Sequence, residues 1–288
     1  MADDDTRRDS LHSDELRSLL LAPDGPLDHF EVVEETGSTN DDVVAALRAD
    51  VAAWPGVGVL VADHQTAGHG RAGRTWETAR GTSLTCTFVV RPQVPPERLG
   101  WFPLLAGLGA VTAIRATAGV PAMLKWPNDL LVPADSEVLG WGAVRKVGGI
   151  LAQLVPTPDG VALVVGIGIN VSQEADELPV ESASSLVVAG AQHVDRESVF
   201  VALVGALADI AERFREADGD AVAAGLADEV AAVCRTIGTR VRVELPGDAE
   251  LVGLAAGIED DGSLRVVDDA GRTHRVLAGD VHHVRDAG

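Results

Sequence analysis

Three consecutive stretches decide the fold: KVGGILAQLV (146–155), PTPDG (156–160) and VALVVGIGIN (161–170). The first and third are apolar, rich in β-branched residues and of strand length, so each predicts a buried strand. The proline and glycine between them predict the turn of a hairpin. Glycines at the start of the first strand and the end of the second remove side chains, which lets a ligand lie against the backbone. A close crossing of two strands needs the same glycines, so the pattern alone leaves both interpretations open.

Further strands and helices are predicted on both sides of this hairpin. Apolar or alternating stretches bounded by turn residues predict strands at 29–35, 57–63, 82–90, 122–126 and 130–132. Helical spacing predicts a helix that ends near 50 and helices at 102–118, 196–216 and 221–233. Residues 133–145 have neither period and are predicted to form an irregular, exposed excursion. Strands and helices mixed in this way indicate an α+β fold.

The pattern changes at residue 237, where five short alternating stretches separated by tight turns begin. Such close spacing predicts a small β-barrel. We therefore expect a larger domain over residues 28–235 and a barrel domain over residues 236–288. Residues 1–27 contain one short amphipathic piece and are expected to form an N-terminal extension, too short for a helix-turn-helix domain.

Composition excludes several classes of protein. A net charge of −21 disfavours a general nucleic-acid binder, which needs a basic face. The polar N-terminus has no signal-peptide core and no apolar run approaches the roughly 18 residues of a membrane span, so we expect a cytoplasmic protein. Cys86 and Cys234 lack metal-ligand spacing and are expected to be buried thiols. Only two lysines occur, Lys125 and Lys146, and their compact ammonium groups are not imitated by the plentiful arginines.

The loop QTAGHGRAGRTW (65–76) has the composition of an anion-binding segment. Its glycines let backbone N–H groups approach an anion, and Arg71 and Arg74 offer planar forks to phosphate or carboxylate. It is not a Walker A loop, because Gly-Lys-Ser/Thr is absent, and it precedes a strand where a dinucleotide fingerprint would open a helix. A flexible surface loop that balances acidic neighbours is the alternative.

Three other short segments carry polar groups suited to a ligand. KWPND (125–129) places a cation, an amide and a carboxylate around a proline turn, a set that could hold triphosphate and Mg²⁺ or simply form an Asn-Asp turn. Asn170 ends the second hairpin strand. Ser38, Thr39 and Asn40 begin a helix, where they act as N-caps and leave N–H groups for a polar ligand. Taken together, these groups fit a ligand with a flat polar head, an apolar body and a carboxylate that meets phosphate.

The order of these segments resembles that of the biotin–protein ligases. The matching stretches are GSTN (37–40), QTAGHGRAGRTW (65–76), KWPND (125–129), KVGGIL (146–151), GIGIN (166–170) and SASSL (182–186). The resemblance implies a mixed-sheet catalytic domain of the class II synthetase and biotin-ligase type, followed by an SH3-like barrel. It also implies ATP-dependent transfer of biotin to a lysine of a biotin carboxyl carrier domain of an acetyl-CoA carboxylase. Family members are monomers or homodimers, and this chain resembles the short form without a DNA-binding domain.

The resemblance further implies roles for individual residues. Lys146 and Arg71 match the catalytic positions. The residues that match the biotin site are Ser38, Thr39, Asn40, Gln65, Gly68, His69, Trp76, Lys146, Gly149 and Leu151. The residues that match the ATP site are Arg71, Arg74, Lys125, Trp126, Asn128, Lys146 and Asn170. Asp129 matches the metal region, with Mg²⁺ as the implied ion.

One departure from the family pattern is visible at His69, where the family loop often has arginine. Its shorter and largely neutral side chain puts retention of the reaction intermediate in doubt. Three alternatives to a biotin ligase are a lipoate or medium-chain acyl ligase on the same scaffold, a biotin-responsive repressor, and a scaffold protein without activity. The polar set Ser38, Thr39 and Gln65 favours biotin over the other acids.

Overall fold

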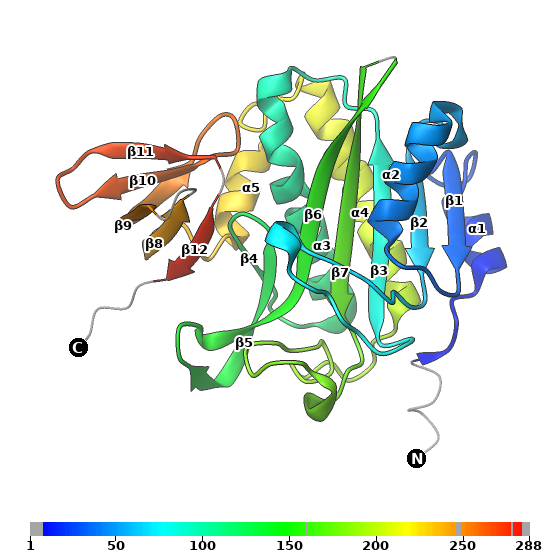
Figure 1. Ribbon diagram of the computed structural model, residues 1–288, viewed down its shortest axis with the longest axis horizontal. Helices are drawn as coiled ribbons and strands as arrows, with labels where there is room; N and C mark the ends of the chain where they lie inside the picture. The colour runs from blue at the N-terminus through cyan, green and yellow to red at the C-terminus, as the bar shows by residue number, and fades with distance from the viewer. Residues whose placement is uncertain (1–7, 159, 246–248, 278, 284–288) are drawn as a thin grey trace.

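The computed structural model describes residues 8–158, 160–245, 249–277 and 279–283, and it contains two sheets (Figure 1). The larger sheet has the strand order β1-β2-β3-β7-β6-β5-β4. Its strands are β1 (His29–Val33), β2 (Gly58–Ala62), β3 (Ser83–Val90), β4 (Met123–Lys125), β5 (Asp129–Val138), β6 (Gly142–Thr157) and β7 (Gly160–Asn170). β1 and β2 pair in parallel and the other neighbours are antiparallel. The sheet is therefore mixed, as the α+β prediction required.

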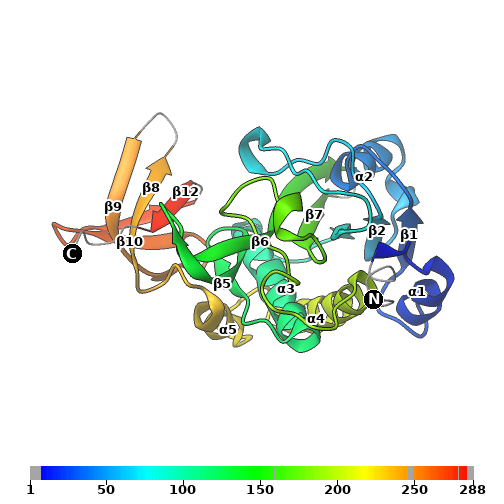
Figure 2. The ribbon, with the colours of Figure 1, turned by 90° about the horizontal axis from the view of Figure 1, so that it is seen from below.

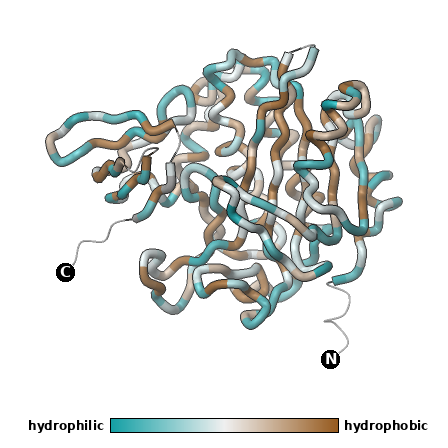
Figure 3. The backbone as a smooth tube through the Cα atoms, in the orientation of Figure 1, coloured by the Kyte–Doolittle hydropathy of each residue, from teal (hydrophilic) through white to brown (hydrophobic). Residues whose placement is uncertain are grey.

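Helices cover the two faces of this sheet unequally. α3 (Phe102–Ala118) and α4 (Arg196–Glu216) lie across one face, whereas the shorter α2 (Thr39–Ala49) covers part of the other (Figures 1 and 2). Successive side chains of β2 point to opposite faces of the sheet. Val59 and Val61 belong to the larger apolar core, and Leu60 belongs to a smaller core under α2. Figure 3 shows the apolar segments concentrated along the sheet and the helices behind it. Because α2 is short, it leaves one end of that face of the sheet uncovered.

The remaining helical segments connect the sheet strands or cover the edges of the fold. They are α1 (Ser13–Leu20), η2 (Val51–Ala53), η3 (Arg71–Gly73), η4 (Pro96–Trp101), η5 (Ala175–Glu177) and α5 (Leu226–Val233). α5 begins five residues later than predicted. The carboxylate of Asp220 accepts hydrogen bonds from the N–H groups of Val222 and Ala223, which favours a turn, and Gly225 adopts φ 73° before the helix begins.

The prediction of an irregular excursion at 133–145 is wrong. β5 and β6 extend through it as a hairpin with a register shift between Pro133 and Val138. Buried Arg145 holds this hairpin together: its guanidinium donates to the carbonyls of Gly142, Val144 and Ser136 at 2.9–3.0 Å. Sequence periodicity does not reveal an arginine that satisfies backbone carbonyls in this way. The tip is exposed as predicted, with Leu139 fully accessible.

The smaller sheet is antiparallel and follows α5. Its strands are β8 (Arg240–Leu245), β9 (Ala249–Ile258), β10 (Leu264–Asp268), β11 (Thr273–Val276) and β12 (Asp280–His283), in the order β11-β10-β9-β8-β12. The prediction of five short strands is confirmed. Two indole N–H groups hold the β9–β10 turn against the larger domain: Trp101 donates to Asp260 O at 2.8 Å and Trp126 to Gly262 O at 3.1 Å.

Within the described residues, one helix is long and apolar enough to cross a membrane by length and composition, and it runs from Pro96 to Ala118 through η4 and α3. The expectation that no apolar stretch approaches such a length was therefore wrong. In the fold, 61% of its apolar window is buried, and α3 packs against both the sheet and α4. That burial is typical of the core helix of a globular domain.

Candidate functional site

A cavity of about 430 Å³ opens on the face of the sheet that α2 leaves uncovered. Its walls come from the start of α2, the 65–77 loop, strands β5 to β7 and the 173–183 segment. The cavity brings together nearly all the predicted site residues: Ser38, Thr39, Asn40, Gln65, His69, Arg71, Arg74, Trp76, Lys125, Trp126, Asn128, Asp129, Lys146, Gly149, Leu151 and Asn170. Gly68 lies behind the wall, where an added Cβ would be 2.7 Å from Trp76 O.

One end of the cavity is polar and rigid, and it is built at the start of α2. Gln65 Oε1 accepts from both the backbone N and the hydroxyl of Thr39, at 2.8 and 2.9 Å. Asn40 Nδ2 donates to Gln153 Oε1 at 2.9 Å. The Thr87 hydroxyl lies 2.7 Å from Asn40 Oδ1 and 2.8 Å from Thr39 Oγ1. Buried polar groups held by this many partners are fixed in place, as recognition of a polar ligand head requires.

Sequence reasoning missed Thr87 and Gln153, because both lie inside strands and belong to no short motif. Each acts on α2 from a different strand, Thr87 from β3 and Gln153 from β6. The available signal was the presence of three threonines, at positions 82, 85 and 87, in the largely apolar stretch TSLTCTFVV (82–90) that contains β3. A buried threonine in a strand requires a hydrogen-bond partner, and Thr87 finds its partners in Thr39 and Asn40 at the start of α2.

The glycines of β6 and β7 receive side chains of the protein itself. A Cβ on Gly166 would lie 2.1 Å from Asn40 Oδ1, and one on Gly168 would lie 2.8 Å from the Trp76 indole. A Cβ on Gly149 would lie 3.3 Å from Lys146 Nζ. The missing side chains at these three positions therefore leave room for Asn40, Trp76 and Lys146 close to the strands.

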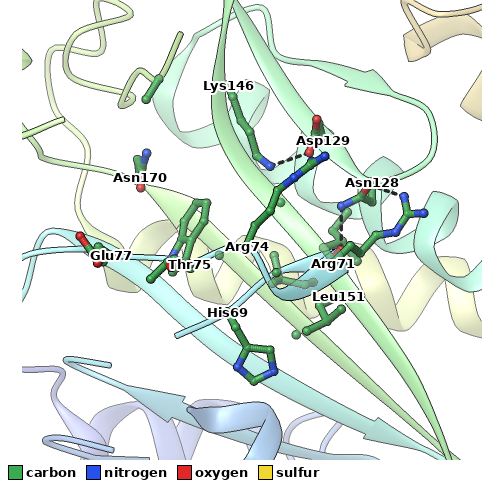
Figure 4. Close-up of a pocket in the computed structure, with 18 of the residues that line it drawn as sticks. His69, Arg71, Arg74, Thr75, Glu77, Asn128, Asp129, Lys146, Leu151 and Asn170 are labelled. Carbon is green, nitrogen blue, oxygen red and sulfur yellow. Dashed lines mark hydrogen bonds and ion pairs between the residues drawn. The ribbon is translucent and has the colours of Figure 1, made fainter. Parts of the chain in front are cut away.

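Both lysines of the chain lie near one carboxylate that lines the cavity, that of Asp129, and Figure 4 shows the Lys146 side chain pointing to it. Lys146 Nζ lies 2.6 Å from Asp129 Oδ1, and Lys125 Nζ lies 3.8 Å from Asp129 Oδ2. Lys125 also lies 5.0 Å from the ring centroid of Trp141. In Figure 4, Arg74 points toward the same carboxylate. More positive than negative charge is thus gathered around Asp129, and such a cluster attracts an anionic ligand.

The glycine- and arginine-containing loop folds over this cluster. A bridge between His69 and Thr75 closes it, and Gly70 N donates to Arg74 O at 2.7 Å. Arg71 Nη1 donates to Asn128 Oδ1 at 2.9 Å, and Asn128 Nδ2 donates in turn to Ile150 O at 3.0 Å. Arg71 therefore ties the loop to the KWPND turn, as a residue that covers a bound ligand would.

His69 lies on the outer side of the loop, away from the Lys146–Asp129 pair (Figure 4). Its Nε2 is 3.6 Å from Asp41 Oδ1, and its side chain is 30% exposed. The side chain thus contacts the first turn of α2, at the border of the cavity.

Two residues predicted to bind nucleotide have their polar atoms engaged by the protein. Asn170 Oδ1 accepts from Ser83 and Gln173, at 3.2 and 3.0 Å, and its Nδ2 donates to Ser184 O. The Trp126 indole donates to the β9–β10 turn of the small sheet. Asn170 is a fixed wall of the cavity, and Trp126 borders the cavity while its indole contacts the small sheet.

Burial raises the pKa of the Cys86 thiol well above its usual range. Cys86 and Cys234 are both buried and unbridged, so the prediction of buried thiols is confirmed. At the other wall, the pKa of Glu177 is lowered by hydrogen bonds from Arg8, so that carboxylate is ionised.

Comparison with known proteins gives consistent matches to one family. The Biotin/lipoate A/B protein ligase family profile matches residues 32–170, and the Biotin protein ligase C terminal domain profile matches residues 236–284. The Biotin–[acetyl-CoA-carboxylase] ligase of Mycobacterium tuberculosis is 38% identical over 291 residues, covering 99% of this chain and all of that protein. The enzyme of the same name from Paracoccus denitrificans is 29% identical and covers 84% of this chain and 95% of that protein.

Solved structures give the same result. The biotin protein ligase of Aquifex aeolicus in complex with biotin and ATP superposes with a TM-score of 0.69 at 26% identity, covering 88% of this chain and 98% of that one.

Proposed function

The chain belongs to the biotin protein ligase family, and on that premise we propose that its cavity joins biotin to ATP and passes the biotinyl group to a carrier lysine of an acetyl-CoA carboxylase. One observation carries the assignment to this cavity. A rigid polar end at Thr39 and Gln65 and a cationic centre at Lys146 lie in one cavity, which is also lined by the apolar side chains of Trp76, Ile150 and Leu151. Biotin has the same order of groups: a polar ureido ring, an apolar body and a carboxylate.

Within the biotin half, Ser38, Thr39 and Gln65 bind the ureido head. The indole of Trp76, the side chain of Leu151 and the exposed backbone of Gly149 line the body of the ligand. Gly68, His69 and Asn40 act indirectly. Gly68 lets the loop pass behind Trp76, His69 offers its backbone, and Asn40 fixes α2 on β6.

In the ATP half, Arg71, Arg74 and Lys125 neutralise the phosphates, with Asn128 holding Arg71 in place. Asn170 forms the wall beside the base. Trp126 supports the turn by docking it on the small sheet.

Mg²⁺ fits this site only as an ion shared with the nucleotide. Among the described residues no group of three or more His, Cys, Asp or Glu side chains could hold a metal. Asp129 supplies one carboxylate, and Mg²⁺ commonly uses one or two carboxylates together with phosphate oxygens. When bound, the ion would neutralise charge on the triphosphate.

The chemistry requires alignment of two anions. An oxygen of the biotin carboxylate attacks the α-phosphorus of ATP, the bond to pyrophosphate breaks, and biotinyl-5′-AMP forms. Lys146, between the two reacting groups, lowers their repulsion, while Asp129 holds its ammonium in place. Arg71 then keeps the loop closed over the mixed anhydride and excludes water. The amine of the carrier lysine attacks the acyl carbon, loses a proton, and AMP leaves.

The test is biotin-dependent release of pyrophosphate from Mg·ATP, with lipoate and no added acid as controls, followed by addition of a carrier domain. We expect release with biotin only, and one labelled lysine on the carrier. A carrier whose acceptor lysine is replaced by arginine is the matched control and should stay unlabelled. Release of pyrophosphate with lipoate and not with biotin would show that the protein is a lipoate ligase.

The setting of this activity is also proposed. We place the protein in the cytoplasm as a monomer or homodimer without nucleic-acid partners, on the grounds of its acidic surface and its small-molecule site. Sedimentation with and without biotin measures the oligomeric state, and a DNA mobility-shift assay tests the repressor alternative.

A further inference from the structure

The N-terminal segment 8–12 crosses the end of the large sheet and reaches the cavity wall. The Arg8 guanidinium forms a bidentate pair with Glu177, Nη1 to Oε1 at 2.9 Å and Nη2 to Oε2 at 2.7 Å. Its Nη2 also donates to Ser172 O at 2.9 Å. The contacts join residues about 165 positions apart in the chain, so they fix one segment on another.

The other end of this segment is anchored in the core. Arg196 and Asp63 form an ion pair at 2.9 Å with side chains only 2% and 3% exposed. The same guanidinium donates to Asp9 O, and Asp63 accepts from Leu11 N at 3.3 Å. The backbone of Arg8 packs against Gly81, where a Cβ would lie 2.4 Å from Arg8 O. Asp9 and Leu11, next to Arg8 in the chain, are thus held by the core through contacts that do not involve Glu177.

The wall that Arg8 holds belongs to the cavity. Gln173, Glu177, Leu178, Pro179 and Val180 all line it. Gln173 contacts Asn170 directly, which places this wall at the base end of the nucleotide half.

The outer part of this wall, residues 174–180, is mostly exposed. Ser172 Oγ and Gln173 Oε1 are buried without a hydrogen-bond partner in the described structure. η5 is a single turn, held by the Glu174–Glu177 capping box. A short, exposed segment with a single helical turn is of low local stability, so an external contact has a large influence on its position.

We propose that Arg8 is a positioning residue for nucleotide binding: it holds the 173–180 wall against the base of ATP through Glu177. The inference rests on the proposed function, because it takes the ligand beside Asn170 to be the adenine of ATP. Biotin binds at the opposite, α2 end of the cavity, whereas Arg8 contacts Ser172 and Glu177 at the base end. Loss of Arg8 therefore affects the two substrates unequally.

The experiment compares KM for ATP and KM for biotin in Arg8→Ala, Glu177→Ala and the double variant. Arg8→Ala should raise KM for ATP by about two- to five-fold, the range that a partly exposed ion pair supplies, and leave KM for biotin unchanged. The double variant should be no worse than the poorer single variant, because both remove one contact. Arg8→Lys keeps the charge without the planar fork and should give an intermediate KM.

The matched control is Arg240→Ala, which removes another exposed bidentate pair, with Asp269 at 2.8 and 2.7 Å, on the small sheet. It should leave both KM values unchanged. An unchanged KM for ATP in Arg8→Ala would overturn the inference, and so would equal rises in both KM values with a lowered melting temperature, which indicate general loosening. A wild-type protein that releases no pyrophosphate with biotin would instead refute the proposed function, and this inference with it.

Discussion

Replacing Lys146 by alanine is the most direct test of the proposed chemistry. Opposite unit charges 4 Å apart attract by about 4 kcal/mol at an effective dielectric constant of about 20. If this attraction acts only on the charge that develops in the transition state, its loss slows the reaction roughly 1,000-fold. Asp129, at 2.6 Å, already offsets part of the lysine charge, so 1,000-fold is an upper bound. We expect a decrease of about 100- to 1,000-fold, comparable with loss of one oxyanion donor.

The fold should survive this change. Lys146 is 28% exposed, and Asp129 keeps a second cation in Lys125 at 3.8 Å, so no uncompensated buried carboxylate is left. The change in unfolding free energy should stay below about 1 kcal/mol. Single-turnover formation of biotinyl-5′-AMP measures the chemical step, and thermal unfolding measures the fold.

Lys125→Ala is the natural comparison, because it removes the other cation on the same carboxylate. It should raise KM for ATP with a smaller loss of rate. A Lys146→Ala rate within five-fold of wild type, with an intact fold, would refute the assignment of Lys146 to the reacting groups. Equal loss in both variants would show that only net charge matters.

Three other perturbations test the loop, the floor and the core. Arg71→Ala breaks the contact with Asn128 and should release adenylate, so mass spectrometry should find biotin on lysines of a bystander protein; selective labelling would contradict the covering role. Gly166→Ala places a methyl group 2.1 Å from Asn40 Oδ1 and should weaken biotin binding in calorimetry by roughly 10- to 100-fold, the equivalent of the about 1–3 kcal/mol that overpacking costs. A Kd for biotin within three-fold of the wild-type value would show that α2 can move away from the added methyl group without loss of binding. Burial raises the pKa of Cys86, so alkylation at pH 8 should be about 100-fold slower in the native protein than in urea, and equal rates would show an open core.

Helices with local end signals could be predicted closely from the sequence. The predicted 102–118 and 196–216 helices coincide with α3 and α4. α3 has Pro103 in its first turn and Gly119 with φ 65° after its last, and Asp195 caps α4 through Ser198 N at 2.8 Å. These signals act within a few residues, so they are readable in one sequence. The β5–β6 hairpin depends on Arg145 and its carbonyl partners, and the spacing of apolar residues in the sequence does not reveal such a contact.

The candidate site shows the same division between local and non-local information. Motif residues such as Gln65 and Lys146 were found because several chemical types stand close together in the chain. Thr87 and Gln153 were missed because each contributes one side chain from a different strand. Arg8 was missed for a stronger reason, since its partner Glu177 lies 169 positions away. A contact across that separation has no signature in either segment alone.

The KWPND turn shows why a motif should not be assigned to one role as a whole. Side chains of an extended chain alternate between two faces, so neighbours in a short strand-turn segment point in opposite directions. Lys125 and Asp129 meet in the cavity, whereas Trp126, between them in the chain, donates to Gly262 of the small sheet. The residue predicted to bind nucleotide thus fixes the β9–β10 turn beside the phosphate end of the site. The position of the small sheet and the geometry of the Lys125–Asp129 pair are therefore set by adjacent residues, so a displacement of the small sheet is expected to move the pair as well.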